Sequence, residues 1–440
     1  MIKRRFFIET FGCQMNIYDS GVISEMLAGE GHEPVDCAAE ADLILINTCS
    51  VRDRAERKVL TRLSELSASK KGRPDLLLGV VGCMAQRLGR KLTENRMGID
   101  LVVGPDSYGK IGGIVAGLAE KRGPAVETTQ DSGCMYAHRP RTFKSVSAFV
   151  TIMRGCDNFC SYCVVPYVRG RERSKPLGDI IMEIEHLVAL GVKEVTLLGQ
   201  NVNSYGDGKT DFAALLEAVD GVKDLRRIRF TTSHPKDLAQ GVIERIRDLP
   251  RVCEHLHLPL QSGSDRILAL MNRGYTYSDY TRIVELARSA IPSIVISTDI
   301  MVGFPGETRS DHEATLRAME EIAFDSAFMF KYSLRAGTHA AGFTDDVKED
   351  EKVERLRHVI ELENSIVDTK KQALLGGDVE ILVQGESRRE TGFLVGRTRK
   401  NWLAKLPQKG VSKGEVVVAE VTGVTRWMIS CDGSVRKAGA

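Results

Sequence analysis

The stretch Ala148-Phe-Val-Thr-Ile-Met-Arg-Gly-Cys156-Asp-Asn-Phe-Cys160-Ser-Tyr-Cys163 joins an apolar run to three closely spaced cysteines. The run of residues 148–153 predicts a buried β-strand, and the cysteines follow in the loop after that strand. In a (β/α) barrel, the loops at the carboxyl ends of the strands build the active site. The stretch therefore predicts a barrel strand that delivers three thiols to a site.

Five further apolar runs follow this strand, and enough residues separate them for a helix between each pair. The runs are residues 194–198, 227–232, 255–260, 294–301 and 326–332. Six strands that alternate with helices predict parallel pairing and an open six-unit (β/α) partial barrel. A long amphipathic helix is expected at residues 349–376, after the last barrel strand.

The residues before the barrel show a second α/β pattern, in which four apolar runs alternate with helical stretches. The runs are residues 5–10, 42–47, 76–81 and 99–103. Because each run is continuously apolar rather than alternating, it is typical of a strand that is buried on both faces of a parallel sheet. The fold class expected here is a doubly wound α/β sheet.

The C-terminal residues and the linker complete the predicted organisation. After the long helix, short runs separated by glycines predict a small antiparallel β-barrel. These runs are residues 378–383, 391–395, 401–406 and 415–422. The predicted domains are an α/β domain at 1–122, a linker rich in proline, glycine and scattered charges at 123–147, the partial barrel at 148–372 and the small β-barrel at 373–437.

The composition, with 42% hydrophobic and 27% charged residues, is that of a soluble globular protein. No apolar stretch approaches the roughly 20 residues that cross a bilayer, and no signal-peptide pattern is present. A cytoplasmic protein without a membrane partner is therefore expected. In a reducing compartment, ten cysteines favour metal binding or catalysis over disulfides. The net charge of +2 neither demands nor excludes an anionic partner.

Cys156, Cys160 and Cys163 have a spacing that favours a metal centre. Thiolates suit zinc and iron–sulfur clusters, and a structural zinc ion needs a fourth ligand that the sequence does not offer nearby. We therefore expect an iron–sulfur cluster with three protein ligands, which leaves one iron open. Three buried cysteines without metal, and a zinc site completed by a distant residue, are the alternatives.

Cys13, Cys49 and Cys83 are far apart in the sequence, but each follows a predicted parallel strand. The carboxyl ends of neighbouring parallel strands meet at one crevice, so the three thiols are expected to converge there. Gly12 and Gly82 permit a close approach of the backbone. The sequence therefore predicts a second cluster with three cysteine ligands, and buried packing of each cysteine is the alternative.

Several motifs resemble those of a known family. The Cys156 motif, with Phe159 and Tyr162 at its aromatic positions, resembles the signature of the radical S-adenosylmethionine (SAM) superfamily. Motifs along almost the whole chain are similar to those of the methylthiotransferase family, and Gly12-Cys-Gln-Met-Asn16 points to its bacterial tRNA branch. The other motifs are residues 47–49, 81–83, 164–170, 198–201, 232–235, 258–264 and 302–308, with a C-terminal region like a TRAM domain.

The resemblance implies a radical SAM enzyme that inserts a methylthio group at carbon 2 of an isopentenylated adenosine at tRNA position 37. It implies two 4Fe-4S clusters, one at the barrel cysteines that binds SAM and an auxiliary one at the N-terminal cysteines that donates sulfur. One SAM molecule would supply the methyl group and a second the radical. A radical is chemically reasonable because an aromatic C–H bond is not acidic enough for a side-chain base.

The resemblance also implies partners and leaves alternatives. The implied partners are the tRNA anticodon stem-loop, a flavodoxin-like or ferredoxin-like electron donor and iron–sulfur assembly proteins, and the implied protein is a monomer. Within the family, the alternative substrates are threonylcarbamoyl-adenosine in tRNA and an aspartate of a ribosomal protein. Outside it, the alternative is an iron–sulfur or zinc protein that binds RNA without catalysis.

Polar residues at the predicted strand ends are the candidates for SAM contacts. They are Gln200, Asn201, Ser233, Gln261, Asp299 and Arg335. Their amide, hydroxyl and carboxylate groups can hydrogen-bond ribose hydroxyls, an adenine edge and the methionine end of SAM, and an arginine suits a carboxylate or a phosphate. Ordinary loop capping is the alternative for each residue. No side chain is assigned a catalytic role.

Basic residues gather in two segments, where tRNA is expected to bind. The first segment has eight basic residues against Asp157 and Glu172: Arg139, Arg141, Lys144, Arg154, Arg169, Arg171, Arg173 and Lys175. The second segment surrounds Trp402 with Arg388, Arg389, Arg397, Arg399, Lys400, Lys405 and Lys409. An exposed aromatic ring can stack on an unpaired base, and a core tryptophan is the alternative for Trp402.

The four remaining cysteines share no spacing with each other or with the two groups. Cys253 precedes His255 and His257, which alternate with leucines as in a strand with one polar face. A structural or pocket-lining role is favoured there over a metal site. Cys134 lies in the linker and is expected to be exposed, whereas Cys37 and Cys431 are expected to pack in the interior.

Overall fold

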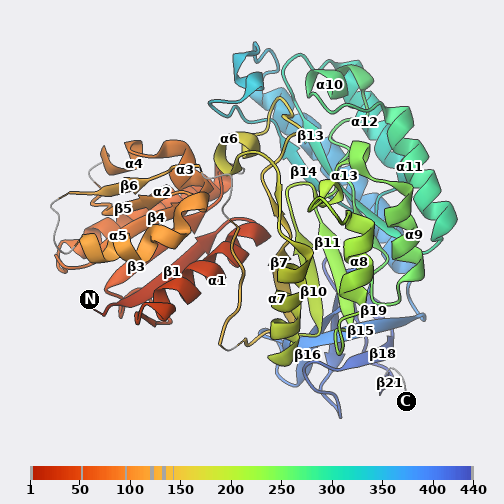
Figure 1. The fold of residues 1–440 in the computed structure, drawn as a ribbon. Helices are drawn as coiled ribbons and strands as arrows, with labels where there is room; N and C mark the ends of the chain where they lie inside the picture. The colour runs from red at the N-terminus through yellow and green to blue at the C-terminus, as the bar shows by residue number, and fades with distance from the viewer. Residues whose placement is uncertain are drawn as a thin grey trace.

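Three regions of β-sheet, joined by helices, make up the fold (Figure 1). The structure is a computed structural model that describes residues 3–50, 53–94, 97–118, 123–130, 135–141 and 143–437. In the view of Figure 1 the N-terminal sheet lies to the left of the central strands, and the C-terminal sheet lies below them. Cys13, Cys49 and Cys83 belong to the N-terminal region, and Cys156, Cys160 and Cys163 belong to the central region.

The N-terminal sheet has the strand order β2-β1-β3-β4-β5-β6, and all neighbouring pairs are parallel. The strands are β1 (Arg5–Phe11), β2 (Glu33–Pro34), β3 (Leu43–Thr48), β4 (Leu77–Gly82), β5 (Leu101–Val103) and β6 (Ala125–Glu127). Because β2 and β3 lie on opposite sides of β1, the winding of the chain reverses there. Such a reversal opens a crevice at the carboxyl ends of the strands.

Helices cover both faces of this sheet because its strands are apolar on both. On one face, Ile44 and Val80 pack against residues of α2, α3 and α4. On the other face, Leu43 and Leu101 pack against residues of α1, η1 and α5. The helices are α1 (Gln14–Gly29), α2 (Asp53–Lys70), α3 (Cys83–Leu88), α4 (Lys91–Glu94), η1 (Pro105–Lys110) and α5 (Ile111–Gly117). The predicted doubly wound sheet is confirmed.

Six parallel strands form the central region, in two sheets with the orders β11-β10-β7 and β12-β13-β14. A parallel bridge between Ile228 and Val252 links the two sheets. The strands are β7 (Ser147–Thr151), β10 (Glu194–Leu198), β11 (Arg227–Thr231), β12 (His255–His257), β13 (Val295–Val302) and β14 (Ser326–Lys331). With β7 and β14 at its two edges, this arrangement is the predicted open partial barrel.

One apolar core joins these strands to the helices around them. The main helices are α7 (Leu177–Ala189), α8 (Phe212–Asp220), α9 (Gln240–Asp248), α11 (Tyr277–Ala290), α12 (Arg309–Ile322) and α13 (Glu349–Gln372). Ile184 of α7, Tyr280 of α11 and Val359 of α13 are fully buried in this core. Figure 1 shows the helices on the outside of the strands, so the strand ends and their loops stay free to form a site.

The C-terminal sheet has the order β19-β20-β17-β16-β15-β18-β21, with antiparallel pairs except between β17 and β20. The strands are β15 (Asp378–Glu386), β16 (Phe393–Thr398), β17 (Leu403–Pro407), β18 (Val416–Glu420), β19 (Gly423–Val424), β20 (Ile429–Ser430) and β21 (Val435–Lys437). The antiparallel character is as predicted. Within the described residues β19 and β21 remain edges, so the sheet does not close into a barrel.

The domain limits proposed from the sequence stay a prediction, since sheet membership alone does not fix where one folding unit ends. Among the residues that the structure describes, no helix has the length and apolarity needed to cross a membrane.

Candidate functional site

The first cysteine group lies at the crevice where the winding of the N-terminal sheet reverses. Cys13 is the N-cap of α1 after β1, Cys49 directly follows β3, and Cys83 begins α3 after β4. Because the three strands are parallel, their carboxyl ends bring these cysteines to the same edge. The ends of β1 and β3 are close together, since a Cβ on Gly12 would lie 2.8 Å from the Cβ of Cys49.

Two asparagines and a glycine hold these strand ends together. Asn16 Nδ2 donates to Asn47 Oδ1 at 3.0 Å, and Asn47 Nδ2 donates to the Asn16 carbonyl at 2.9 Å. The Cys13 thiol donates to Asn16 Oδ1 at 3.3 Å. Gly82 has a φ of +94°, and a Cβ there would lie 2.5 Å from Asn47 Oδ1. Asn16, Asn47 and Gly82, which lie next to the cysteines in the sequence motifs, therefore hold the ends of β1, β3 and β4 against one another.

The electrostatics of this group favour a thiolate at one cysteine. The pKa of Cys13 falls to about 6 because it accepts a hydrogen bond from the Cys49 side chain and lies near the Arg169 guanidinium. Burial raises the pKa of Cys83, and Arg169 opposes that effect. Nε of Arg169 donates to Cys83 Sγ at 3.2 Å. The thiolate is the form that binds metal.

The second cysteine group lies in the loop between β8 (Met153–Arg154) and α6 (Val165–Arg169). Burial and the neighbouring Cys160 raise the pKa of Cys156 to about 11 and that of Cys163 to about 12, so the three sulfurs lie within electrostatic reach of one another. Metal binding here would displace thiol protons. Nη1 of Arg273 donates to Cys160 Sγ at 3.3 Å. The sequence motifs do not indicate Arg273, because it lies 113 residues after Cys160 in the chain.

The helix α6 connects the two groups. It begins two residues after Cys163 and packs against α3, the helix that begins with Cys83. Val164 and Val168 form a small buried cluster with Cys83. The two cysteine groups therefore lie on either side of one helix contact, between the N-terminal sheet and the central strands.

Buried ion pairs fix α1 to the chain around the second group. Asp19 of α1 is fully buried, and it accepts hydrogen bonds from Arg154 at 2.7 Å and from Arg169 at 2.8 Å. Lys175 pairs with Glu183 at 2.6 Å, and both are buried. The prediction that Arg154, Arg169 and Lys175 belong to a tRNA-binding surface is wrong, because buried carboxylates already pair with them.

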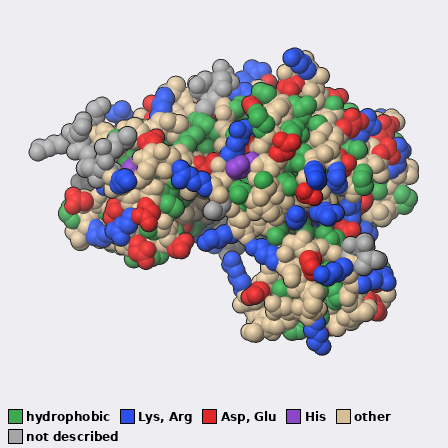
Figure 2. Space-filling model, turned by 60° about the horizontal axis from the view of Figure 1, so that its bottom comes forward, with side chains coloured by type: hydrophobic (Ala, Val, Ile, Leu, Met, Phe, Trp, Pro, Cys, Tyr) green, Lys and Arg blue, Asp and Glu red, His purple; other side chains and the backbone are tan. Residues whose placement is uncertain are grey.

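In the first basic segment, residues 139–175, fewer basic side chains are exposed than the sequence indicates. Arg139, Arg141 and Lys144 of the linker are exposed. Arg171 pairs with Asp157 at 2.6 Å on the surface, and Arg173 pairs with Asp106 at 2.8 Å. Figure 2 shows Lys and Arg side chains along the hollow between the N-terminal part and the C-terminal sheet. A smaller basic surface therefore remains available to an anion.

The candidates for SAM contacts lie within or just after the carboxyl ends of the strands from β10 to β14. Gln200 and Ser233 each bury a side-chain oxygen that has no hydrogen-bond partner among the described residues, and both amide atoms of Asn203 are in the same state. Buried polar atoms without partners are rare in proteins, and a ligand is one explanation. Asn203 was not among the predicted residues, although it lies in the same loop as Gln200.

Asn201 differs from its neighbour. Its side chain donates to Asp237 at 2.7 Å and accepts from the His234 amide at 3.1 Å. Asn201 is almost fully buried. Both ends of its amide are therefore engaged in holding the loops after β10 and β11 together.

Gln261, Asp299 and Arg335 lie on the second half of the barrel. Gln261 is buried with a φ of +73°, and its backbone bridges to Ile300 of β13. The Asp299 side chain is partly exposed, and its Oδ1 lies 3.7 Å from His257 Nε2. Arg335 is almost buried in the segment after β14. The partly exposed carboxylate makes Asp299 the most accessible of the three.

The histidines of β12 form a polar face with β13, in keeping with the predicted alternation. His257 Nδ1 lies 3.0 Å from Ser297 Oγ, and His255 Nε2 lies 3.3 Å from the same oxygen. Burial and Arg229 lower the pKa of His255 to about 3. Cys253, just before them, is buried.

The other cysteines outside the two groups behave differently. Cys431 is fully buried in the core of the C-terminal sheet, as expected. Cys37 is exposed, so the prediction that it packs in the interior is wrong. It lies in the connection between β2 and β3, outside the apolar faces of the sheet. Cys134 falls outside the described residues.

Part of the second basic segment also serves the interior contacts of the molecule. Arg399 pairs with Glu254 at 2.8 Å and donates to the Val252 carbonyl, which attaches the C-terminal sheet to the barrel. Trp402 is half-buried against the core of its sheet. Arg399 is therefore engaged in contacts within the molecule, and the packing of Trp402 favours the core alternative for that residue.

Trp427, which no sequence motif indicates, is the exposed tryptophan. It follows β19, and 75% of it is exposed. The Arg426 guanidinium lies 4.7 Å from the centre of its ring. No sequence pattern distinguishes Trp427 from Trp402, because both lie in segments with basic neighbours.

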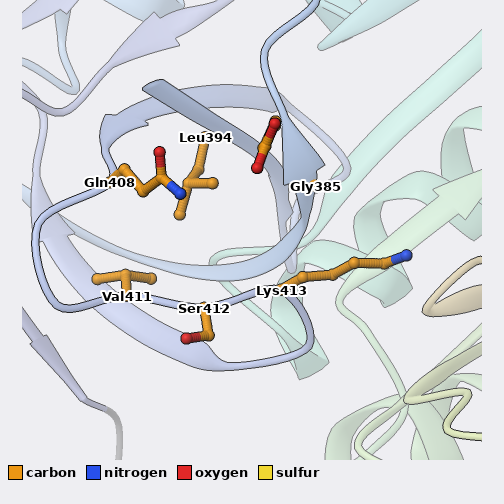
Figure 3. A pocket seen from close by; sticks show the side chains of 7 residues that line it. Gly385, Leu394, Gln408, Val411, Ser412 and Lys413 are labelled. Atoms are coloured by element: carbon orange, nitrogen blue, oxygen red, sulfur yellow. The ribbon is translucent and has the colours of Figure 1, made fainter. Parts of the chain in front are cut away.

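A separate pocket of about 450 Å³ lies on the C-terminal sheet (Figure 3). It is lined by Gly385, Glu386, Leu394, Gln408, Val411, Ser412 and Lys413. The Lys413 amine donates to the Lys144 carbonyl, so this pocket adjoins the linker. Its lining has no cysteine or histidine and belongs to neither cysteine group.

The two cysteine groups fit iron–sulfur clusters by their chemistry. Each offers three thiols, and in each a buried arginine donates to one sulfur. In the part of the chain that the structure describes, no three His, Cys, Asp or Glu side chains converge as the ligands of a single ion. The thiolates of a 4Fe-4S cluster bind different irons, so they need not meet at one point.

Comparison with protein families matches the two regions that carry the cysteines. The family described as "Radical SAM superfamily" matches residues 150–319. The family described as "Uncharacterized protein family UPF0004" matches residues 5–104.

Curated relatives match nearly the whole chain. The tRNA-2-methylthio-N(6)-dimethylallyladenosine synthase of Moorella thermoacetica is 44% identical over 98% of this chain and 98% of its own length. The enzyme of the same name from Carboxydothermus hydrogenoformans is 45% identical over 96% of this chain and 97% of its own length. Among solved structures, the radical SAM methyltransferase TsrM from Kitasatospora setae, with cobalamin and a 4Fe-4S cluster bound, has a TM-score of 0.55. The match covers 75% of this chain and 72% of TsrM, and at 16% identity it shows a shared fold.

Proposed function

Because this chain belongs to the family of tRNA-2-methylthio-N(6)-dimethylallyladenosine synthases, which are radical SAM enzymes, we propose that it inserts a methylthio group at carbon 2 of isopentenylated adenosine 37 in tRNA. The observation that carries the proposal is the identity of 44% over almost the full length of both chains. The target is an aromatic C–H bond, which a side-chain base cannot deprotonate. When bound, SAM and the 4Fe-4S clusters supply the radical, the methyl group and the sulfur.

In this proposal the two cysteine groups have different roles. Cys156, Cys160 and Cys163 hold the cluster that binds SAM, with three ligands from the protein and one iron left for the cofactor. The N-terminal group, Cys13, Cys49 and Cys83, holds the auxiliary cluster that is the source of sulfur. The contact of α6 with α3 supports a joint reaction of the two groups, because the first group's Cys83 begins α3 and the second group directly precedes α6.

The loops after the barrel strands bind SAM in this proposal. Gln200 and Ser233 are the favoured contacts, because each buries a polar atom without a partner among the described residues. Asp299 offers a partly exposed carboxylate for a hydroxyl or ammonium group. Gln261 and Arg335 are candidates by position, and Asn201 acts indirectly by holding the loops.

We further propose that the anticodon stem-loop of tRNA binds along the linker and the C-terminal sheet. The exposed Arg139, Arg141 and Lys144 of the linker and the exposed Trp427–Arg426 pair of the C-terminal sheet support this placement. Residues 1–122 would then hold the auxiliary cluster, residues 148–372 would bind SAM, and residues 373–437 would bind tRNA, with the linker between the first two domains.

The proposal also includes partners of the enzyme. A flavodoxin-like or ferredoxin-like donor would supply electrons in the cytoplasm, assembly proteins would supply the clusters, and the enzyme would act as a monomer.

Nucleoside mass spectrometry of tRNA tests the reaction. In a strain that lacks the gene, the methylthio-isopentenyl-adenosine peak should disappear and the isopentenyl-adenosine peak should rise. The wild-type gene should restore the modified peak, and a C49A variant should not. An unchanged peak in the deletion strain would exclude this substrate, and a change confined to threonylcarbamoyl-adenosine or to a ribosomal-protein peptide would favour the alternatives.

Iron analysis tests the two cluster sites. Anaerobically reconstituted protein should hold about eight irons per chain, from two clusters of four. A variant that lacks Cys156, Cys160 and Cys163 should hold about four, and so should a variant that lacks the N-terminal group. A count near four in the wild-type protein would contradict the two-cluster assignment.

Trp427 provides a test of the tRNA surface. Stacking of an aromatic side chain on a base contributes about 1–3 kcal/mol, so W427A should raise the KM for tRNA about tenfold. The kcat should stay unchanged because Trp427 lies between β19 and β20 of the C-terminal sheet, which contributes no residue to either cysteine group. W427F, which keeps an aromatic face, is the matched control and should retain most of the affinity. Equal KM values for W427A and the wild type would remove Trp427 from the surface.

A further inference from the structure

In each cysteine group, one sulfur accepts a hydrogen bond from a buried arginine. Arg169 donates to Cys83 at 3.2 Å, and Arg273 donates to Cys160 at 3.3 Å. Both arginines are at most 5% exposed. Burying a guanidinium is costly unless its environment satisfies it, so such contacts are built features of a fold.

Arg169 is held in place from the opposite side. Its Nη2 donates to Asp19 at 2.8 Å, while its Nε points to the Cys83 sulfur. Asp19 also accepts from Arg154 at 2.7 Å and from the Tyr108 hydroxyl at 3.2 Å. These hydrogen bonds hold the Asp19 carboxylate in place, and the carboxylate in turn holds the Arg169 guanidinium against the Cys83 sulfur.

The buried ion-pair network around Asp19 contains more cations than anions. One buried carboxylate faces two buried guanidinium groups, those of Arg154 and Arg169. Charge interactions are strong in a buried environment because little water screens them. Hydrogen bonds and nearby charge at the sulfur ligands are among the factors that set the reduction potential of an iron–sulfur cluster.

We propose that Arg169, held by Asp19, is a positioning residue that fixes the Cys83 sulfur and raises the reduction potential of the auxiliary cluster. This inference rests on the proposed assignment of Cys13, Cys49 and Cys83 as the ligands of that cluster. Reduction adds one negative charge to a cluster, and the Arg169 guanidinium stabilises that charge. Its removal therefore makes the auxiliary cluster harder to reduce.

Arg273 provides a matched control from the same protein. Its other hydrogen bonds go to the Pro259 carbonyl and to the hydroxyl groups of Tyr162 and Tyr275. Among the described residues these contacts belong to the barrel, and its sulfur contact is with the other cysteine group. Substitution of Arg273 should therefore leave the auxiliary cluster unchanged.

The test is a redox titration of the auxiliary cluster, followed by electron paramagnetic resonance. The background is the full chain with Cys156, Cys160 and Cys163 replaced by alanine, reconstituted anaerobically so that only the auxiliary cluster is present. In this background, R169M should make reduction at least tenfold less favourable, which corresponds to about 59 mV for a one-electron couple. R273M in the same background should leave the midpoint potential unchanged.

The outcomes separate this inference from the proposed function. If the background protein itself holds no irons, the cluster assignment fails. If it holds about four irons and R169M leaves the midpoint potential unchanged, the inference about Arg169 fails. An equal shift in R273M would also overturn it, because the effect would then be a general change in packing. If R169M does not fold by circular dichroism, R169Q, which keeps donors beside Asp19, is titrated with the same criterion. Loss of iron from a folded R169M or R169Q chain, with iron retained in R273M, would support the positioning role.

Discussion

His312 is a buried histidine whose charge state affects the stability of the barrel. It lies on α12, and its ring is 5.7 Å from the ring of His358 on α13. Burial and the Arg355 guanidinium lower its pKa to about 4. The unfolded chain binds a proton at about pH 6.5, so the unfolded state is protonated first as the pH falls. The neutral His312 ring therefore makes its full contribution to the free energy of unfolding above pH 6.5. This contribution is lost as the pH falls from 6.5 to 4.

H312Q should make the stability of the protein less dependent on pH. Each pH unit within that window costs the wild type up to about 1.4 kcal/mol at this residue, and glutamine does not titrate. Urea unfolding at pH 7.5 and pH 5.0, followed by circular dichroism, measures the difference for both proteins. The loss of stability on acidification should be about 2 kcal/mol smaller in H312Q. Identical losses in both proteins would show that His312 does not titrate as its burial indicates.

At the scale of elements, the turn from β4 into α3 decides whether Cys83 reaches its partners. Gly82 has a φ of +94°, and an added Cβ would lie 2.5 Å from Asn47 Oδ1. We expect G82A to displace the end of β4 and to reduce the iron content from about eight to about four per chain. G191A is the control, because Gly191 has a φ of +97° with no atom within 4 Å of the added Cβ, so it shares only the conformational cost. Full iron content in G82A would contradict this reading of the turn.

The strands were predictable from the sequence because burial on both faces leaves a continuous apolar run. β3 and β4 lie within one residue of their predicted limits for this reason. The convergence expected for the N-terminal cysteines followed from the order of elements alone. By contrast, the interior role of Arg154 could not be predicted, because its partner Asp19 lies 135 residues earlier in the chain. A count of charges within one segment cannot include such a partner.

At the scale of the whole molecule, Arg229 joins the barrel to the C-terminal sheet. Its Nε pairs with Glu194 at 2.9 Å, and its other nitrogens donate to the carbonyls of Thr398 and Arg399. Arg229 and Glu194 are both buried. R229M should therefore lower the free energy of unfolding by about 3–5 kcal/mol, because it leaves a buried carboxylate without its cation.

A companion variant tests this explanation for Arg229. E194Q combined with R229M removes the unpaired charge, so it should recover part of the lost stability in the same urea experiment. Limited proteolysis should cleave near the start of β15 faster in R229M than in the wild type, because the sheet is less firmly attached. A double variant no more stable than R229M would mean that the carbonyl contacts, rather than the charge pair, supply the stability.

The two cysteine groups differ in how much of the fold each one needs. Cys156, Cys160 and Cys163 share one loop, whereas Cys13, Cys49 and Cys83 meet only after three strands have paired. In the proposed assignment, damage to the first sheet would therefore separate the ligands of the sulfur-donating cluster, whereas the three barrel cysteines would stay together in one loop. In the proposed assignment, such a damaged chain would keep consuming SAM without modifying any RNA. Prompt degradation of partly unfolded copies would then conserve a costly metabolite.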